Sequence, residues 1–377
     1  MALAAQGYRV TIITIAISTN LYQQDLSLIA AYSNINIHIV SDLYGPNSFT
    51  DRAIYKLGRS LKKYLNIESS LSLGYGAYKY FKACKAINAS LYICHQELAT
   101  YIGTKLMAHG YKVAFDFEDW YSEDLLLQAR KERPLNLLRK AEHTALKDGS
   151  YCITTSKVLA GKLSETYSSK APNVIYNVFP SRQDILQKTK DFTGTLKLFW
   201  FSQTIGLGRG LEQFISISAK LKKPLELHLL GNIHNAYRGQ LISIMPVQHQ
   251  LHFHPLVPEN DLANKIALFD IGLALELDTP MSRNYTITNK FFQYIQAGLP
   301  VIASKTAGQK EGFEQFEPGF MLSQKPTDAE IVALEKWLED PVELQAARIR
   351  TIEAAKAYNW DNESGKLLAF VKKTLDK

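Results

Sequence analysis

Strand-like runs alternate with helix-length amphipathic segments along nearly the whole chain. The runs are short and rich in branched and aromatic residues, whereas the segments between them repeat apolar residues at three- and four-residue spacing. Such alternation is typical of βα units around a parallel sheet. The expected strands lie at residues 8–14, 35–40, 90–95, 111–117, 150–156, 172–178, 196–202, 225–231, 250–255, 269–275 and 299–304. The sequence therefore predicts an α/β fold.

A polar stretch at residues 181–195 divides this alternation into two series. It carries no clear apolar strand, and we interpret it as an interdomain linker. A chain of 377 residues is also too long for one ordinary core. We therefore expect two doubly wound, Rossmann-like domains at residues 1–180 and 196–355. A C-terminal helix at residues 356–377 should pack back toward the first domain. Ligands of such folds bind at the carboxyl ends of the strands, here facing the cleft between the domains.

The composition excludes several classes of protein. Apolar residues make up 46% of the chain and charged residues 21%, which is typical of a globular protein. No run of about 18 apolar residues is present to span a membrane, and the first residues lack the pattern of a secretory signal. Cys84, Cys94 and Cys152 are odd in number and widely spaced, which predicts buried thiols rather than a disulfide or metal framework. We expect a cytoplasmic protein.

The first expected strand of the second series runs into a glycine-rich turn. The stretch FWFSQTIGLGRG covers residues 199–210 and places three glycines around Arg209. Glycines let the backbone approach a ligand, and the free N–H groups of a helix start favour an anion. Arginine adds a permanently charged donor. The stretch could form only a tight turn, or it could bind a diphosphate.

A second stretch, NYTITNKFFQYIQAGLPVIAS, covers residues 284–304. Thr288 or Asn289 is a natural N-cap, so a helix again begins with exposed N–H groups. Lys290 then lies in the first helical turn, where a cation is unfavourable unless an anion is close by. A bound phosphate would explain this lysine, as would a side chain that extends into solvent.

Together these stretches resemble the nucleotide-sugar-binding domain of a large family of retaining GT-B glycosyltransferases that builds bacterial surface polysaccharides. The segments FSQTIGLGRGLEQFI, LELHLLGN, FDIGLALE and TNKFFQYIQAGLPVIAS follow the family's order and approximate spacing. Residues 95–124 resemble its acceptor-domain segment, and YNVFP at residues 176–180 resembles the sequence before the interdomain crossing. The resemblance covers nearly the whole chain. It implies a GT-B fold, in which two Rossmann-like domains face a central cleft.

The resemblance also implies roles for individual residues in donor binding. Arg209 matches the basic residue that holds the donor diphosphate, above a glycine loop. Residues 288–290 match a helix start that meets the phosphates or the sugar. The donor-binding candidates are Ser202, Gln203, Thr204, Gly206, Gly208, Arg209, Thr288, Asn289, Lys290 and Gln293.

Four further residues are candidates for catalysis. His95 resembles a histidine that reaches the donor sugar from the opposite domain, although a core histidine at a strand end is the alternative. Glu118 and Asp119 resemble an acidic pair near the acceptor, or are surface and capping carboxylates. Glu276 ends a strand at the edge of the cleft, where it could bind a sugar hydroxyl or pair with a basic neighbour.

The sequence departs from the family pattern in two places. Many members carry two glutamates eight positions apart, where this chain has Tyr285 and Gln293. This leaves the donor open, and Glu276 is the nearest candidate to replace them. Members also begin with a strand, a glycine-rich loop and a long helix, of which only the helix end has a counterpart here. We expect about thirty residues to be lacking from the first domain, so that either the true start lies upstream or the domain is incomplete and the chain weakly active or inactive.

The implied reaction transfers a sugar from a nucleotide diphosphate sugar to a hydroxyl of a glycan or lipid-linked acceptor, in cell-surface polysaccharide synthesis. The leaving diphosphate gains negative charge, which Arg209 and Lys290 would stabilise. We expect no cofactor, no nucleic acid partner and no metal, because the sequence shows no Asp-x-Asp or His/Cys ligand set. The alternatives are a sugar-nucleotide epimerase of the same fold, or an inactive GT-B subunit that binds nucleotide or a partner.

The net charge of +7 lies entirely in the first half of the chain. Residues 1–190 hold 23 Lys/Arg against 15 Asp/Glu, whereas residues 191–377 hold 20 against 21. From Arg52 to Lys85 there are eight basic residues and one acidic residue, Glu68, and residues 51–65 form an amphipathic helical pattern. An ordinary solvated helix would explain this. The alternative is a surface that docks on anionic lipid at the inner face of the cell membrane.

Overall fold

The computed structural model describes residues 1–45, 48–187 and 189–376, and it divides into two compact units. Unit 1 comprises Met1–Thr154, Ala160–Ile175 and Ser364–Lys377, and unit 2 comprises Thr155–Leu159 and Tyr176–Glu363. The chain passes between the units after Ile175, five residues before the expected boundary. Lys188 in the expected linker and Lys377 at the chain end lie outside the described residues.

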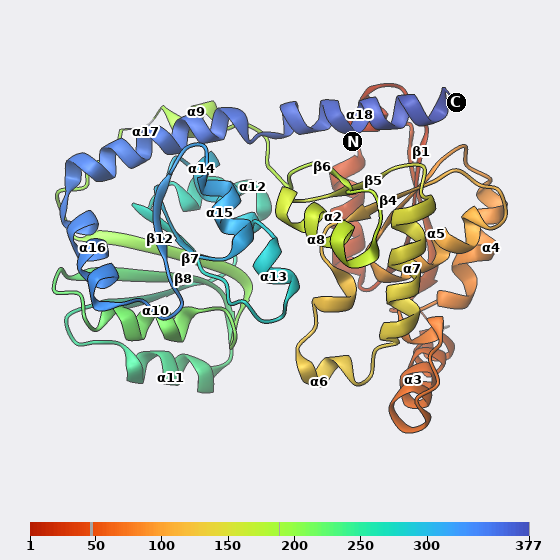
Figure 1. Cartoon of the computed structure of the whole chain (residues 1–377), viewed down its shortest axis with the longest axis horizontal. Helices are drawn as coiled ribbons and strands as arrows, with labels where there is room; N and C mark the ends of the chain where they lie inside the picture. Colours follow the sequence, from red (N-terminus) through yellow and green to blue (C-terminus); the bar gives the residue numbers. More distant parts are fainter. Residues whose placement is uncertain (46–47, 188, 377) are drawn as a thin grey trace. The chain divides into compact units, whose positions relative to one another are not determined.

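Unit 1 contains two parallel sheets (Figure 1). The first pairs β1 (Val10–Ala16) with β2 (Ile35–Asp42), and the second has the order β3-β4-β5-β6. The strands of the second sheet are β3 (Tyr92–His95), β4 (Val113–Phe117), β5 (Cys152–Thr154) and β6 (Asn173–Val174). That the family's first strand is lacking stays a prediction.

Helices α5 and α7 contact β4 and bury apolar side chains there. Val113 and Phe115 of β4 are fully buried, and Gly103 of α5 allows close packing there, because a Cβ at that position would lie 2.6 Å from the Phe115 ring. All three cysteines are free and buried, as predicted. The helices are α1 (Ala2–Ala5), α2 (Thr19–Ile29), α3 (Ser48–Leu65), α4 (Ala77–Ile87), α5 (Gln96–Met107), α6 (Leu127–Arg130), α7 (Leu135–Asp148) and α8 (Lys157–Tyr167), with 3-10 turns η1 (Ser70–Ser72) and η2 (Tyr121–Glu123).

Unit 2 has one six-stranded parallel sheet of order β12-β11-β10-β7-β8-β9. The chain begins in the middle at β7, adds β8 and β9 outward, and returns to β10 on the other side of β7. The point where the strand order reverses therefore lies between β7 and β10, which is where doubly wound folds bind ligands. The strands are β7 (Leu196–Ile205), β8 (Leu225–Ile233), β9 (Gln250–His254), β10 (Ile271–Ala274), β11 (Val301–Ser304) and β12 (Gly319–Leu322), the last of which was not predicted.

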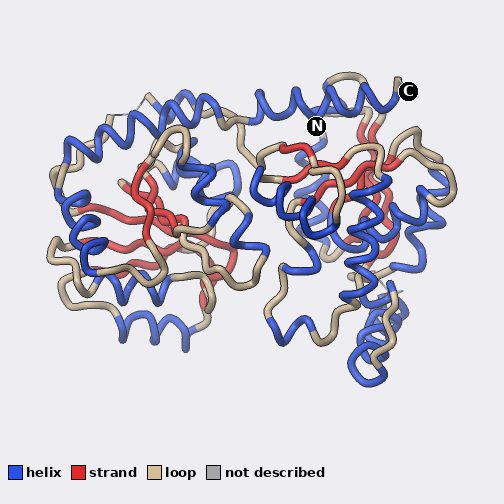
Figure 2. Tube along the Cα trace, in the orientation of Figure 1, coloured by secondary structure: helices blue, strands red, loops and turns tan. Residues whose placement is uncertain are grey.

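Helices cover both faces of this sheet, as Figures 1 and 2 show. One face packs its apolar side chains, including the fully buried Trp200, against α10, α11 and α16. On the other face, α14 contacts β10 and β11. The helices of unit 2 are α9 (Gln183–Leu186), α10 (Leu211–Ser218), α11 (Asn235–Ile244), α12 (Glu259–Ile266), α13 (Ser282–Tyr285), α14 (Asn289–Gln296), α15 (Ala307–Phe313), α16 (Asp328–Glu339), α17 (Pro341–Ala357) and α18 (Trp360–Leu375), which continues into unit 1.

A buried tyrosine holds the centre of the sheet together. Tyr294 of α14 is fully buried, and its hydroxyl lies 3.0 Å from the carbonyl oxygen of Phe199 on β7 and 3.3 Å from that of Leu273 on β10. Gly272 makes room for the ring, because a Cβ there would overlap it. The hydroxyl thus supplies a donor at the junction of the two central strands, next to the paired residues Gly272 and Phe199.

The expected linker is part of unit 2. Residues 181–195 include α9, whose Ile185 and Leu186 are 1% and 4% exposed. Arg348 of α17 donates to the Leu186 carbonyl at 3.3 Å. Ile185, Leu186 and Phe192 are buried, whereas most other described residues of this polar segment are exposed or half-buried. At the chain end, Phe370 of α18 stacks on Tyr151 within unit 1, with ring centroids 5.7 Å apart.

Candidate active site

The glycine turn of unit 2 connects the end of β7 to the start of α10. Gly208 and Gly210 have φ values of +73° and +78°, and a Cβ at Gly210 would lie 3.1 Å from that of Leu275. These two positions therefore require glycine, whereas Gly206 does not have a positive φ. The strand extends to Ile205, three residues beyond its predicted end, and the register with β8 shifts between Phe201 and Thr204. Ser202, Gln203 and Thr204 thus lie in the last part of β7, the latter two exposed.

Lys290 of α14 is largely buried at the same edge of the sheet. Its side chain is 13% exposed, and its Nζ lies 3.6 Å from Oε1 of Glu276, which follows β10. The ammonium also lies 5.3 Å from the centroid of the Trp200 ring. Lys290 is therefore not a lysine that extends into solvent. Glu276, 6% exposed, pairs with this basic neighbour, one of its two expected roles.

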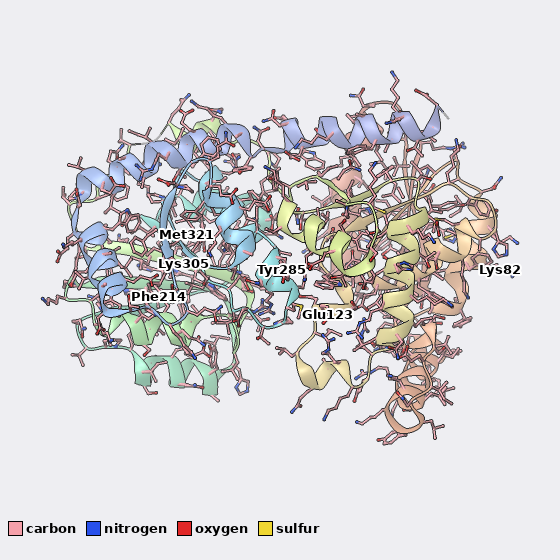
Figure 3. The ribbon with its side chains drawn as sticks, viewed as in Figure 1. Lys82, Glu123, Phe214, Tyr285, Lys305 and Met321 are labelled. Atoms are coloured by element: carbon pink, nitrogen blue, oxygen red, sulfur yellow. The ribbon has the colours of Figure 1, made fainter. Side chains whose placement is uncertain are left out.

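Two further cations, Arg209 and Arg283, lie close enough to Lys290 for their charges to act on it. Burial lowers the pKa of Lys290; Glu276 opposes this effect, while the positive charges of Arg209 and Arg283 add to it. Nη1 of Arg283 in α13 donates to the Gly208 carbonyl at 3.0 Å, which ties this helix to the glycine loop. Figure 3 labels Tyr285, the last residue of α13. Such an excess of positive charge favours a bound anion.

The remaining donor-binding candidates lie on or near the start of α14. Thr288 is its N-cap, and its hydroxyl accepts from the Phe291 N–H at 3.4 Å. Asn289 is exposed in the first turn. Oε1 of Gln293 is buried and has no hydrogen-bond partner in the part of the chain that the structure describes. It can accept a hydrogen bond from a ligand hydroxyl.

The catalytic candidates of unit 1 gather at the ends of β3 and β4. His95 ends β3 and is paired in register with Asp116 of β4. Its Nδ1 lies 2.9 Å from Oδ2 of Asp116 and 4.0 Å from Oε1 of Glu118. The His95 side chain is 52% exposed, so His95 is not a core histidine. Asp119 is half-buried in the loop after β4.

The carboxylates determine the charge of His95. Burial alone would lower the pKa of His95, but the hydrogen bond and charge of Asp116, together with the charge of Glu118, raise it above the ordinary value. Burial and the neighbouring Asp116 raise the pKa of Glu118. The two carboxylates thus favour the protonated form of His95, and Asp116 holds its Nδ1.

The backbone next to His95 adopts an unusual conformation. Gln96, the first residue of α5, has a φ of +69°. Its N–H donates to the Tyr121 hydroxyl at 2.9 Å, and this hydroxyl donates to the Asp116 carbonyl at 2.7 Å. Tyr121 therefore joins the ends of β3 and β4 and fixes the direction in which His95 leaves its strand. A left-handed conformation in a residue other than glycine is often found at functional sites.

Part of the candidate site was missed in the sequence. Asp116 and Arg283 were not predicted, although each contacts a predicted residue or loop. The alignment of the ends of β3 and β4 could have indicated Asp116, whereas no sequence pattern marks Arg283. His95, Asp116 and Glu118 also form a set whose ligand atoms all lie within 4.8 Å of one another and could hold a metal ion. Metal independence therefore stays a prediction.

No protein-family model and no curated protein sequence matches the chain. Solved structures do resemble it. Sucrose-phosphate synthase from Thermosynechococcus elongatus has a TM-score of 0.72 at 14% identity, over 99% of this chain and 90% of that one. HepE from Anabaena, in complex with UDP-glucose, has a TM-score of 0.65 at 14% identity, over 97% and 99% of the chains. A glycosyltransferase from Rickettsia africae has a TM-score of 0.58 at 14% identity, over 98% and 99% of the chains.

The chain has the GT-B fold. This confirms the predicted fold class, with Rossmann-like units built on parallel sheets. At these low sequence identities the likeness establishes the fold alone. The use of the site must be argued from its residues.

Proposed function

We propose that the protein is a glycosyltransferase that moves a sugar from a nucleotide diphosphate sugar to a hydroxyl of an acceptor. The observation that carries this proposal is the buried pair of Lys290 and Glu276 at the edge where ligands bind in doubly wound folds. Arg283 lies against the glycine turn of the same unit, and the charges of Arg209 and Arg283 both act on Lys290. A diphosphate matches the excess positive charge. HepE, which shares the fold, was solved with UDP and with UDP-glucose.

The chemistry follows from the charge that develops as the sugar leaves. The bond between the anomeric carbon and the diphosphate breaks, so negative charge grows on the phosphate oxygens. Arg209 and Lys290 stabilise this charge, because they are already positioned before the reaction. Glu276 orients the Lys290 ammonium. We further propose that His95 assists transfer of the sugar as a charged donor, held by Asp116.

The finer features of the reaction are also proposals. They are retention of the anomeric configuration, independence from metal, and an acceptor that is a glycan or lipid-linked sugar in surface-polysaccharide synthesis. These features rest on the resemblance of the sequence motifs to the retaining family. The configuration of the product is read from the anomeric proton by NMR, and activity that survives EDTA would support metal independence.

The primary test is a donor screen on the full chain. UDP, GDP and their sugars are titrated by calorimetry, and release of nucleotide is then measured with and without candidate acceptors. We expect one nucleoside diphosphate to bind, and acceptor-dependent release of that nucleotide from its sugar. A chain that binds nucleotide but releases none with any acceptor would instead be the inactive subunit. Interconversion of free sugar nucleotides would identify an epimerase.

Association with an anionic membrane surface is proposed for α3 and α4. Phe49, Leu57 and Tyr64 of α3 are 79%, 54% and 75% exposed, beside the basic residues of that helix. Several of these basic residues are already paired within unit 1, however: Arg59 and Lys63 with Glu132, Lys62 with Glu68, and Lys79 with Asp51. No helix in the described ranges is long and apolar enough to cross a membrane.

Three lysines of this surface that form no ion pair with any described residue allow a sharper liposome test. Lys56, Lys82 and Lys85 are exposed, and Figure 3 labels Lys82 on α4. Sedimentation with anionic vesicles should decrease when all three become Glu, and it should also decrease at high salt, since each basic residue near such a surface contributes about 1 kcal/mol. Binding that is insensitive to both changes would contradict electrostatic docking and favour a soluble acceptor.

A further inference from the structure

Three histidines and one glutamate gather on the edge of the unit 2 sheet, outside the candidate active site. Glu226 and His228 lie on β8, and His252 and His254 lie on β9, the edge strand. The parallel register places His228 opposite His252. Residues two apart on a strand share a face, so all four side chains lie on the same face of the sheet.

The four side chains contact one another directly. The rings of His228 and His252 are stacked, with centroids 4.5 Å apart and an interplanar angle of 14°. Nδ1 of His228 lies 3.0 Å from Nε2 of His254, and Nε2 of His228 lies 3.0 Å from Oε2 of Glu226. In contrast, Nε2 of His252 is buried and has no hydrogen-bond partner among residues 1–45, 48–187 and 189–376. A buried polar nitrogen without a partner is uncommon, and a bound water or ion is one explanation for it.

We propose that Glu226, His228 and His252 bind a Zn²⁺ ion. One ligand atom from each residue lies within 4.8 Å of the other two. Tetrahedral zinc with bonds of about 2.0–2.1 Å places its ligand atoms roughly 3.4 Å apart, so the ligand atoms must move by about 1.5 Å or less. The His252 ring must also turn out of its stack on His228, so that its nitrogen faces the ion. Imidazole nitrogen with a carboxylate oxygen is a typical zinc ligand set. The fourth position is left for water.

His254 positions His228 toward the ion. When Nε2 of His228 binds Zn²⁺, its proton resides on Nδ1 and is donated to Nε2 of His254, which is 3.0 Å away. His254 then carries its own proton on Nδ1, so both rings stay neutral and only the tautomers change. A metal-ligating histidine commonly donates its second nitrogen to a fixed acceptor in this way.

The consequence of binding is a cross-link between β8 and the edge strand. The ligands Glu226 and His228 come from one strand and His252 from the other, so the ion holds β9 in register. A ligand that binds only the folded protein stabilises it by mass action. Zn²⁺ should therefore raise the temperature of unfolding, without any requirement for nucleotide.

The test uses the untagged full chain, because a histidine tag would bind the ion itself. Zn²⁺ is titrated by calorimetry, and Co²⁺ is added as a spectroscopic probe, since a tetrahedral Co²⁺ site absorbs far more strongly than an octahedral one. We expect one Zn²⁺ per chain. Both Glu226→Gln and His252→Gln should weaken the binding of Zn²⁺ at least tenfold. Both should also abolish the rise in unfolding temperature that Zn²⁺ causes. The Glu226 side chain is only partly buried, with 21% of its surface exposed, and glutamine has nearly the same shape. The variant Glu226→Gln should therefore fold.

Two controls make the outcome decisive. His109→Gln alters an exposed histidine that follows α5 in unit 1. This variant should leave Zn²⁺ binding unchanged. Asp116→Asn alters the other candidate set, His95, Asp116 and Glu118. Binding that is lost in Asp116→Asn but kept in Glu226→Gln would overturn the proposal, as would a chain that takes up no stoichiometric Zn²⁺.

Discussion

Neutralising Lys290 should weaken nucleotide binding strongly. In the variant Lys290→Gln the diphosphate loses one charge-assisted hydrogen bond, which contributes about 1.5–3 kcal/mol, or roughly a 10- to 150-fold change in Kd. The buried carboxylate of Glu276 then remains without its cation, which adds repulsion toward the phosphates. Calorimetric titration with UDP measures the loss. Lys220→Gln is the matched control, because Lys220 is 59% exposed and pairs with Asp328 at the surface of the same unit.

A second variant separates binding from folding. At 3.6 Å and an effective dielectric constant near 20, the attraction between Lys290 and Glu276 is about 4–5 kcal/mol before desolvation is subtracted. Removing the lysine alone should therefore destabilise the free protein. The double variant Lys290→Gln/Glu276→Gln removes both charges and should recover stability, but not the affinity for UDP. A UDP Kd within threefold of the native value in both variants would refute the assignment.

The same lysine makes binding depend on pH. Because its pKa is lowered from 10.5 in the free protein, mainly by burial, part of the Lys290 population loses its proton at a pH below that value. A bound diphosphate restores the charge, so binding takes up a proton. The affinity for UDP should therefore fall as pH rises through the lowered pKa. Lys290→Arg, which stays charged, should flatten this dependence, and an unchanged slope in that variant would point to another group.

Two further changes test other parts of the molecule. His95→Gln should lower sugar transfer at least tenfold while the UDP Kd stays within twofold, because the proposed phosphate contacts belong to unit 2; equal loss of both would contradict a role in transfer. Tyr294→Phe should lower the free energy of unfolding by about 1–3 kcal/mol, because the carbonyls of β7 and β10 lose a buried donor. Urea denaturation measures this, with the exposed Tyr64→Phe as the control.

The sequence predicted the strands well where apolar runs are bounded by turns. The run at residues 225–231 forms the first part of β8, and Thr288 caps α14 as expected. Both features depend on local chemistry, namely the period of apolar side chains and the hydrogen-bonding capacity of a threonine before a helix. The turn after β7 was found for the same reason, since a positive φ at Gly208 and Gly210 requires glycine.

What the sequence did not predict depends on contacts between distant segments. Asp116 reaches His95 only because β3 and β4 pair in one particular register. Arg283 contacts the glycine loop through a carbonyl oxygen 75 residues away. The histidines of β8 and β9 are unremarkable within their separate strands and form a cluster only when His228 is placed opposite His252. Register is decided by packing of the whole sheet, which a single stretch does not encode.

The lack of the glutamate pair found in the glycosyltransferase family that the sequence resembles has an expected electrostatic consequence. Gln293 and Tyr285 stand where many members carry carboxylates, so Arg209, Arg283 and Lys290 are balanced only by Glu276 among the residues that act on this lysine. The free site therefore holds a net positive charge, which a bound diphosphate would neutralise. We expect UDP to raise the temperature of unfolding substantially, while uridine, which lacks the phosphates, raises it little. Equal stabilisation by the two would mean that the base and ribose, rather than the diphosphate, provide the binding energy, and the charge argument for this site would then be wrong.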